Sequence, residues 1–311
     1  MIAAESGRLR VGMIGVGGVA QKYVGAYAGY PRSELAVVCD VDPAAADAAA
    51  AHGAVVAPSA EALVAADIDA VVISTPNFLH HAQAAMALAA GKHVLLQKPM
   101  TVTAAEARDL HDLAAVRGVQ LGLYMNSLDS PVIRDLKAMI DAGCFGRMGA
   151  VNAKLANGRG ASFKTADGTA TWRGSRQAVG GGSFAMLAYH YVNLAQWLLD
   201  QPITGITAVA ANLMSPHIEG DDIMAGIATF RDGSFGILES SWCVKGEQMS
   251  IHGSEGSAMR PHSSPLMKLP TRPDARPSGT QGAIRSVTCS QGRPALRAHS
   301  IMAAITPSMP P

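Results

Sequence analysis

Short apolar runs alternate with alanine-rich stretches of helical spacing from Arg10 to about Tyr124. The short runs predict strands, and the longer stretches between them predict helices. Strands that alternate with helices are typical of a doubly wound parallel sheet. We expect strands at Val11–Ile14, Leu35–Cys39, Val55–Val56, Ala70–Ser74, His93–Leu96 and Gln120–Leu123, and helices at Asp42–Ala51, Leu79–Ala90 and Ala104–Arg117.

The pattern changes after a connecting helix that we expect at Val132–Ala142. Further strands, with a long helix after the first, are predicted at Val151–Leu155, Ile206–Ala211, Ile223–Phe230 and Ser234–Ser240. The segment Arg231-Asp232-Gly233 suits a hairpin turn, so this sheet should be mostly antiparallel. A sheet with one open face is often a subunit interface, and we therefore expect a homo-oligomer that assembles through it.

A glycine-rich loop follows the first apolar run, with the sequence GVGGVA. Gly15 suits a tight turn, Gly17 leaves room for a pyrophosphate, and Ala20 lets the next helix approach the strand. The second apolar run ends at Asp40, where a dinucleotide fold places the acid that accepts ribose hydroxyls. No Arg or Lys follows Asp40 to neutralise a 2′-phosphate, which favours NAD over NADP. The cofactor-binding candidates here are Gly15, Gly17, Gly18, Val19, Ala20 and Asp40; an ordinary glycine turn is the alternative for the loop alone.

Composition excludes several function classes. A formal net charge of +1 over 311 residues creates no field that would recruit nucleic acid or an anionic membrane. The four cysteines form no C-x-x-C pair, so we expect neither a disulfide framework nor a metal site. The start of the chain lacks the apolar core of a signal peptide, and no apolar stretch is long enough to span a bilayer. We expect a cytoplasmic enzyme or binding protein.

Four landmarks, in order between Arg10 and Ala258, resemble the glucose-fructose oxidoreductase / inositol dehydrogenase (Gfo/Idh/MocA) family. They are the glycine loop with Asp40; Ser74-Thr75-Pro76-Asn77 with His80; Gln97-Lys98-Pro99; and Trp172-Arg173 followed by Gly180-Gly181-Gly182-Ser183 and His190. A weaker landmark is Gly220-Asp221-Asp222, which leads through Phe230-Arg231-Asp232-Gly233 to Ser241-Trp242. The resemblance implies an NAD-dependent oxidoreductase that transfers a hydride between nicotinamide and a secondary hydroxyl of a sugar, sugar acid or cyclitol. It also implies an N-terminal Rossmann domain followed by an α+β domain with a mostly antiparallel, open-faced sheet.

Lys98 is the first catalytic residue that the resemblance implies. In this role its ammonium hydrogen-bonds the reacting oxygen and supplies positive charge as that oxygen becomes alkoxide-like. Gln97 stands where the family usually has Glu, so the lysine lacks that acidic neighbour.

His190 is the second catalytic residue that the resemblance implies, as the group that takes the hydroxyl proton. The family usually carries an acid four residues earlier, on the same helical face. Met186 occupies that position here, and Asn193 stands where a further Asp is common. Met186 is therefore expected to make the pocket floor less polar. His190 could act as an acid/base group, bind a hydroxyl or pack in the core.

Further candidates follow from the same resemblance. On the cofactor side they are Ser74, Thr75, Pro76, Asn77, His80, Gln97 and Lys98, with helix capping as an alternative role for Asn77. On the substrate side they are Lys98, Trp172, Arg173, Met186 and His190, although Arg173 is equally well interpreted as a surface charge.

The chain departs from the family pattern after Ala258. The last 53 residues hold 9 of the 17 prolines, seven of the 25 basic residues and no Phe, Trp or Tyr. We therefore expect residues 1–126 to form the NAD-binding domain, residues 127–258 an incomplete substrate and oligomerisation domain, and residues 259–311 a mostly disordered tail. One hypothesis is that the reading frame shifts near Ala258.

Two other functions are compatible with these residues. One is a redox-neutral enzyme of the same fold that retains its NAD through oxidation, elimination and re-reduction. The other is a dinucleotide-binding sensor that has lost catalysis, which the replacement of the acid by Met186 favours.

Overall fold

The structure, a computed structural model, describes residues 8–125, 128, 130–260 and 286–289. Its chain falls into two compact units, which are described separately. The first unit contains the chain up to Tyr124 together with Gln177–Gly180, and the second contains Met125–Arg176 and the chain from Gly181 onward.

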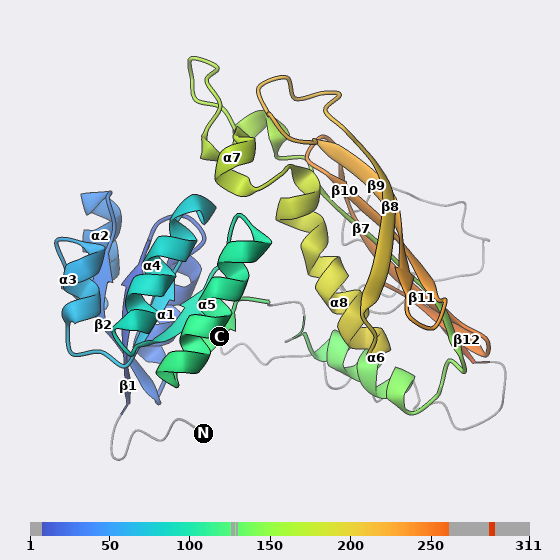
Figure 1. Ribbon diagram of the computed structural model, residues 1–311, viewed down its shortest axis with the longest axis horizontal. Helices are drawn as coiled ribbons and strands as arrows, with labels where there is room; N and C mark the ends of the chain where they lie inside the picture. The colour runs from blue at the N-terminus through green and yellow to red at the C-terminus, as the bar shows by residue number, and fades with distance from the viewer. Residues whose placement is uncertain (1–7, 126–127, 129, 261–285, 290–311) are drawn as a thin grey trace, which may run out of the picture. The chain divides into compact units, whose positions relative to one another are not determined.

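The first unit, drawn in blue to green in Figure 1, is built on a six-stranded parallel sheet with the order β3-β2-β1-β4-β5-β6. From the centre of the sheet, β1 to β3 follow one another outward on one side and β4 to β6 on the other, as in a Rossmann fold. This order confirms the predicted doubly wound sheet. Its elements are β1 (Leu9–Ile14), α1 (Gln21–Gly29), β2 (Ser33–Cys39), α2 (Pro43–Ala50), β3 (Val55–Val56), α3 (Ala60–Ala65), β4 (Ala70–Ile73), α4 (Asn77–Ala89), β5 (His93–Leu96), α5 (Ala104–Arg117) and β6 (Leu121–Leu123).

Helices cover both faces of this sheet, which is why its central strands are apolar on both sides. On one face, Met13 and Val72 pack with α1 and α2. On the other face, Ile14 and Ile73 pack with α3, α4 and α5. The helix α3 was not predicted because six residues are too few to show a helical period.

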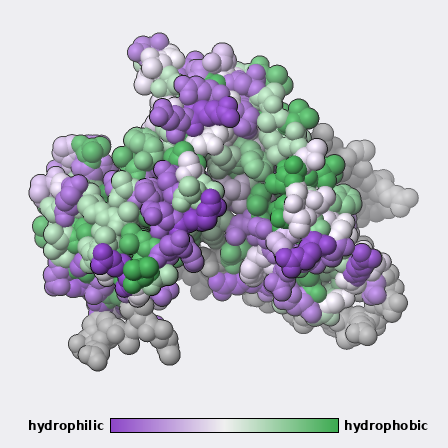
Figure 2. Space-filling model, viewed as in Figure 1, coloured by the Kyte–Doolittle hydropathy of each residue, from purple (hydrophilic) through white to green (hydrophobic). Residues whose placement is uncertain are grey.

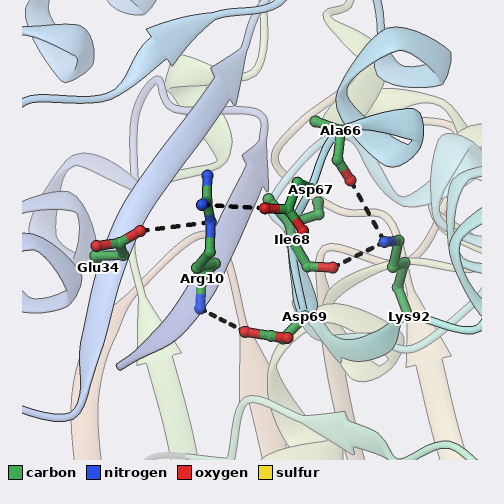
Figure 3. Close-up of polar contacts among 7 residues, drawn as sticks. All are labelled: Arg10, Glu34, Ala66, Asp67, Ile68, Asp69 and Lys92. Atoms are coloured by element: carbon green, nitrogen blue, oxygen red, sulfur yellow. Dashed lines mark hydrogen bonds and ion pairs between the residues drawn. The ribbon is translucent and has the colours of Figure 1, made fainter. Parts of the chain in front are cut away.

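Charged side chains hold the amino-terminal edge of the parallel sheet together. Arg10 on β1 forms ion pairs with Glu34 on β2 at 3.5 Å and with Asp67 at 3.1 Å, and its backbone N–H donates to Asp69 at 2.7 Å. The Lys92 ammonium donates to two backbone carbonyls of the loop that precedes β4 (Figure 3). The ion pairs of Arg10 are largely exposed, so their contribution to stability is modest.

The second unit is built on a seven-stranded sheet with the order β13-β12-β11-β7-β10-β9-β8. Only β7 and β10 pair in parallel, so the sheet is mixed but mostly antiparallel, as predicted. Its elements are α6 (Pro131–Asp141), β7 (Met148–Asn157), the short helices η2 (Gly160–Ser162) and η3 (Trp172–Gly174), α7 (Arg176–Val179, mostly assigned to the first unit), the π-helix η4 (Phe184–Ala188), α8 (Tyr189–Leu199), β8 (Ile203–Ala211), β9 (Ile223–Phe230), β10 (Phe235–Ser241), β11 (Lys245–Gly253), β12 (Gly256–Arg260) and β13 (Ser286–Cys289).

One face of the second sheet packs against α6 and α8, through residues such as Leu136, Leu194 and Leu238. The other face leaves apolar side chains exposed on neighbouring strands, including Ile227, Phe235 and Ile237. Hydrophobic residues also gather in Figure 2 over the region where Figure 1 draws β8 and β9. The predicted hairpin between β9 and β10 is confirmed by the turn hydrogen bond from the Gly233 N–H to the Phe230 carbonyl.

Strands β11, β12 and β13 were not predicted. β11 lacks a clean alternation of apolar and polar residues, because its buried positions Met249, Ser250 and Ile251 are consecutive. β12 continues past Ala258 and pairs with β13, so part of the segment expected to be disordered belongs to the sheet. Residues 261–285 and 290–311 of that segment lie outside the described residues.

Candidate cofactor and catalytic site

The glycine loop after β1 passes directly against the end of β4. Gly15 has a φ of +81°, and a Cβ on it would lie 2.8 Å from the Ser74 carbonyl carbon and 2.9 Å from the Thr75 nitrogen. Both the backbone conformation and the contact therefore require glycine at this position. Gly17 and Gly18 differ, because a Cβ on Gly18 would meet nothing within 4 Å and one on Gly17 only Asp40 Oδ2 at 3.8 Å. The loop thus leaves open space beside these two residues.

Asp40 fixes this loop from the end of β2. Its Oδ2 accepts the backbone N–H groups of Val16 at 2.7 Å and Gly17 at 3.2 Å, and its Oδ1 accepts the N–H of Asp42 at 2.9 Å. Carboxylate oxygens have further lone pairs, so Asp40 can still accept hydroxyl groups of a ligand. Val41, next in the chain, is fully exposed and uncharged.

The polar groups around the loop fit a dinucleotide. The N–H groups of Gly18 and Val19 precede α1 and donate to no acceptor within the described residues. Orphan N–H groups at a helix N-terminus form a site for phosphate oxygens. The Ser74 hydroxyl is buried and also lacks a partner among the described residues. NAD is the group that these donors and the Asp40 carboxylate would hold.

His80 is fully buried on α4 and links two loops of the same sheet edge. Its Nε2 lies 2.9 Å from the Thr75 carbonyl oxygen, and its Nδ1 lies 2.9 Å from that of Pro99. Burial lowers the pKa of His80 and outweighs the nearby carbonyls, which raise it. The side chain therefore joins the Ser74–Asn77 segment to the Gln97–Pro99 segment. Pro76, rather than Asn77, occupies the capping position of α4, and it makes no side-chain cap bond.

Lys98 follows β5 at the same carboxyl edge and is half-buried. The preceding Gln97 is buried, and its side-chain oxygen accepts the backbone N–H of Lys98 at 3.0 Å. The amide at this position thus fixes the main chain at Lys98. The strand order puts the ends of β2, β1, β4 and β5 side by side, so the structure brings Asp40, the glycine loop, Ser74 and Lys98 to one edge.

In the second unit, two glycine-containing segments pack backbone against backbone. A Cβ on Gly182 would lie 2.2 Å from the Asp221 carbonyl oxygen, and one on Gly220 would lie 2.3 Å from that of Gly181. Asp221 Oδ2 accepts the Ser183 hydroxyl at 2.8 Å and the Phe184 N–H at 3.0 Å. This carboxylate therefore anchors the start of the helix that carries the histidine, a role that the sequence did not assign to it.

The neighbouring Asp222 is fully buried and holds a different loop. Its two carboxylate oxygens accept the N–H groups of Leu213 at 3.0 Å and Met214 at 2.8 Å. Burial alone would raise the pKa of Asp222, but these donors and the Cys243 thiol lower it by more. The Gly220-Asp221-Asp222 motif is thus a structural junction of the second unit.

Trp172 and Arg173 lie on η3, and the Arg173 guanidinium stacks on the Trp172 ring at 4.3 Å from its centroid. Burial, reinforced by the charge of Arg159, lowers the pKa of Arg173. The last residue of η3 is hydrogen-bonded to Glu219, whose N–H donates to the Gly174 carbonyl at 2.8 Å. η3 is therefore held against the same junction as the histidine helix.

His190 lies in the first turn of α8, directly after the π-helical segment Phe184–Ala188 that contains Met186. π-Helical turns are uncommon and occur frequently at functional sites. The Nε2 of His190 lies 2.8 Å from the Tyr189 hydroxyl, and the two rings lie 4.2 Å apart at 32°. Sequence reasoning missed Tyr189, because adjacent helix residues are not expected to face each other.

The described residues include no helix long and apolar enough to cross a membrane. Within the same residues, no three His, Cys, Asp or Glu side chains gather in a way that could hold a metal ion.

Two family models match the chain. Residues 9–125 match the Gfo/Idh/MocA oxidoreductase family, NAD-binding Rossmann fold, and residues 133–259 match the C-terminal domain of the same family.

Individual proteins agree with these matches. The chain is 31% identical to dTDP-3,4-didehydro-2,6-dideoxy-alpha-D-glucose 3-reductase of Streptomyces violaceoruber, over 89% of this chain and 80% of that protein. It is 28% identical to inositol 2-dehydrogenase of Rhizobium meliloti, over 83% of this chain and 77% of that protein. Among solved structures, the WlbA dehydrogenase of Bordetella pertussis in complex with NADH and UDP-GlcNAcA has a TM-score of 0.77 at 25% identity, over 93% of this chain and 79% of that chain.

Proposed function

Because the chain belongs to the Gfo/Idh/MocA family of NAD-binding oxidoreductases, we propose that it is an NAD-dependent dehydrogenase of sugars, sugar acids or cyclitols. It would transfer a hydride between nicotinamide and the carbon of a secondary hydroxyl. The observation that carries this proposal is the carboxyl edge of the first unit, where the glycine loop, Asp40, Ser74 and Lys98 end neighbouring strands.

The cofactor, when bound, supplies the hydride acceptor. The N–H groups of Gly18 and Val19 would hold its pyrophosphate, and Asp40 would accept its ribose hydroxyls. The negative charge of Asp40, with no basic residue beside it, would repel a 2′-phosphate. This is the reason for preferring NAD to NADP.

The substrate side of the proposal follows from the family pattern. Lys98 would donate a hydrogen bond to the reacting oxygen and stabilise negative charge on it. His190 would accept the hydroxyl proton, and Trp172, Arg173 and Met186 would contact the rest of the substrate. The similar proteins from Streptomyces violaceoruber and Rhizobium meliloti carry the names of a deoxysugar reductase and an inositol dehydrogenase, which supports this substrate class.

A second candidate function is a non-catalytic dinucleotide sensor. The observation that favours it is Met186 at the position where the family usually carries the acid that assists the histidine. This candidate shares the nucleotide site and differs only in lacking turnover.

The open face of the second sheet is the surface through which we propose that the chain assembles with its own copies. Ile227 is 50% exposed and Phe235 45% exposed, although both are large apolar residues. Exposed apolar surface of this kind marks an interaction site. Light scattering on the wild type and on Ile227→Lys would test the proposal: a monomeric wild type would contradict it.

An assay of NADH formation at 340 nm tests the proposed activity. The protein would be incubated with NAD or NADP and a panel of inositols, aldoses and aldonic acids, with Lys98→Ala as the matched variant. NAD-dependent turnover that Lys98→Ala abolishes is expected. Substrate consumption without NADH would favour the redox-neutral cycle, and NAD binding without any turnover would favour the sensor.

A further inference from the structure

The second unit contains a partner for His190 that the family pattern does not include. We propose that Tyr189 is the positioning residue of His190, and that its hydroxyl orients the imidazole as a carboxylate four residues earlier does in the family pattern. This inference rests on the proposed function, in which His190 accepts the hydroxyl proton. Met186, at the usual acid position, has a thioether that is only a weak hydrogen-bond acceptor.

Two contacts with Tyr189 restrain the imidazole. The Tyr189 hydroxyl oxygen lies 2.8 Å from His190 Nε2, which is a normal hydrogen-bond distance. The ring planes are tilted by 32° with their centroids 4.2 Å apart. The hydrogen bond fixes one ring nitrogen and the ring contact limits rotation of the imidazole, so together they favour one orientation.

A phenol suits this task in both charge states of the histidine. When the neutral imidazole carries its hydrogen on Nε2, the Nε2–H donates to the Tyr189 hydroxyl oxygen, and Nδ1 is then the nitrogen that accepts the substrate proton. The bond from Nε2–H persists after Nδ1 is protonated, because the hydroxyl oxygen is the acceptor in both charge states. Tyr189 therefore keeps its hydrogen bond while His190 gains and loses the substrate proton, without adding a negative charge.

The element that carries the pair is itself anchored. Asp221 accepts the Ser183 hydroxyl and the Phe184 N–H at the start of the π-helical segment, and Ser183 also bonds to the Ser240 hydroxyl at 2.9 Å. The segment then leads directly into Tyr189 and His190. A positioning residue is effective only on such a fixed support.

Ring nitrogen shifts of ¹⁵N-labelled histidine test the inference without any substrate, with the His190 signals assigned by their loss in His190→Asn. We expect a single hydrogen-bonded tautomer in the wild type and averaged shifts in Tyr189→Phe, which keeps the aromatic ring and removes the hydroxyl. Tyr191→Phe is the matched control, because it removes the next tyrosine hydroxyl, which bonds to Glu247 instead. Unchanged His190 shifts in Tyr189→Phe would overturn the inference.

Kinetics give a second readout. Tyr189→Phe should lower kcat by about 10- to 100-fold, within the ~10²–10⁴ that acid–base catalysis supplies in all, and leave the KM for NAD unchanged. Adding Met186→Asp to Tyr189→Phe should restore part of kcat. A double variant no faster than Tyr189→Phe would contradict the idea that the Tyr189 hydroxyl does the work of the family's carboxylate.

A wild type without turnover would contradict the proposed function, while the nitrogen shifts still decide the role of Tyr189.

Discussion

The two units hold their candidate functional groups in different ways. In the first unit, the glycine loop and Lys98 are placed by backbone contacts, such as the approach of Gly15 to β4 and the N–H of Lys98 bonded to Gln97. In the second unit, a neighbouring side chain contacts the imidazole directly, because the Tyr189 hydroxyl lies 2.8 Å from His190 Nε2. A site set by backbone geometry tolerates few substitutions, whereas a side-chain partner can be replaced by another residue that reaches the same atom.

The largest loss of stability is expected where two backbone segments of the second unit are in close contact. Gly182→Ala places a Cβ 2.2 Å from the Asp221 carbonyl oxygen, which neither segment can avoid without moving. We expect the free energy of unfolding to fall by about 4 kcal/mol or more, measured by urea denaturation of the full chain. Gly246→Ala is the control, because its Cβ would meet only a lysine side-chain carbon at 3.7 Å. Equal free energies of unfolding for the two variants would contradict the close packing of Gly182 against Asp221.

The next largest effect compares the two edges of the parallel sheet. Lys98→Ala should lower kcat by roughly 10²–10³, the range for removal of one donor to a developing oxyanion, with little change in NAD binding. Lys92→Ala removes a lysine from the amino-terminal edge, where it bonds only backbone carbonyls, and should keep kcat. Similar kcat values for Lys98→Ala and Lys92→Ala would contradict a catalytic role for the carboxyl edge.

A smaller effect is expected from the buried histidine of the first unit. The pKa of His80 is lowered in the folded state, so the unfolded chain takes up a proton at higher pH than the folded chain does. Stability from neutral His80 is therefore present above about pH 6.5 and is lost as the pH falls toward its folded pKa.

His80→Gln should flatten this pH dependence, at a cost of about 1–2 kcal/mol at neutral pH from the altered hydrogen bonds. Denaturation of wild type and variant between pH 7.5 and 5 measures both effects. His111→Gln changes an exposed histidine and serves as the control. A variant with the wild-type slope would show that His80 does not carry the effect.

The sequence predicted the first unit almost element for element. Short apolar runs between helices define buried parallel strands, and the glycine loop has a local chemical signature; only α3 was too short to detect. In the second unit the sequence predicted the strands with clear alternation, such as β9, and missed β11, whose buried positions are consecutive.

Contacts between distant or unexpected residues could not be predicted. Asp221 lies 38 residues after Ser183 in the chain, and nothing local indicates that it anchors that helix. Tyr189 neighbours His190 in sequence, but helix geometry ordinarily directs adjacent side chains apart. The Asp221 contact and the bridging position of His80 join segments that are distant in the chain, so they depend on the tertiary structure.

The central claim is that the carboxyl edge of the first unit binds NAD through the glycine loop and Asp40. Titration of the full chain with NADH and with NADPH, followed by nucleotide fluorescence, tests it most directly. The wild type should bind NADH more tightly than NADPH, and Asp40→Ala should weaken NADH binding by about 10- to 100-fold, as expected for lost hydrogen bonds to a charged group. Failure of the wild type to bind either nucleotide, or equal binding of both that Asp40→Ala leaves unchanged, would contradict the account.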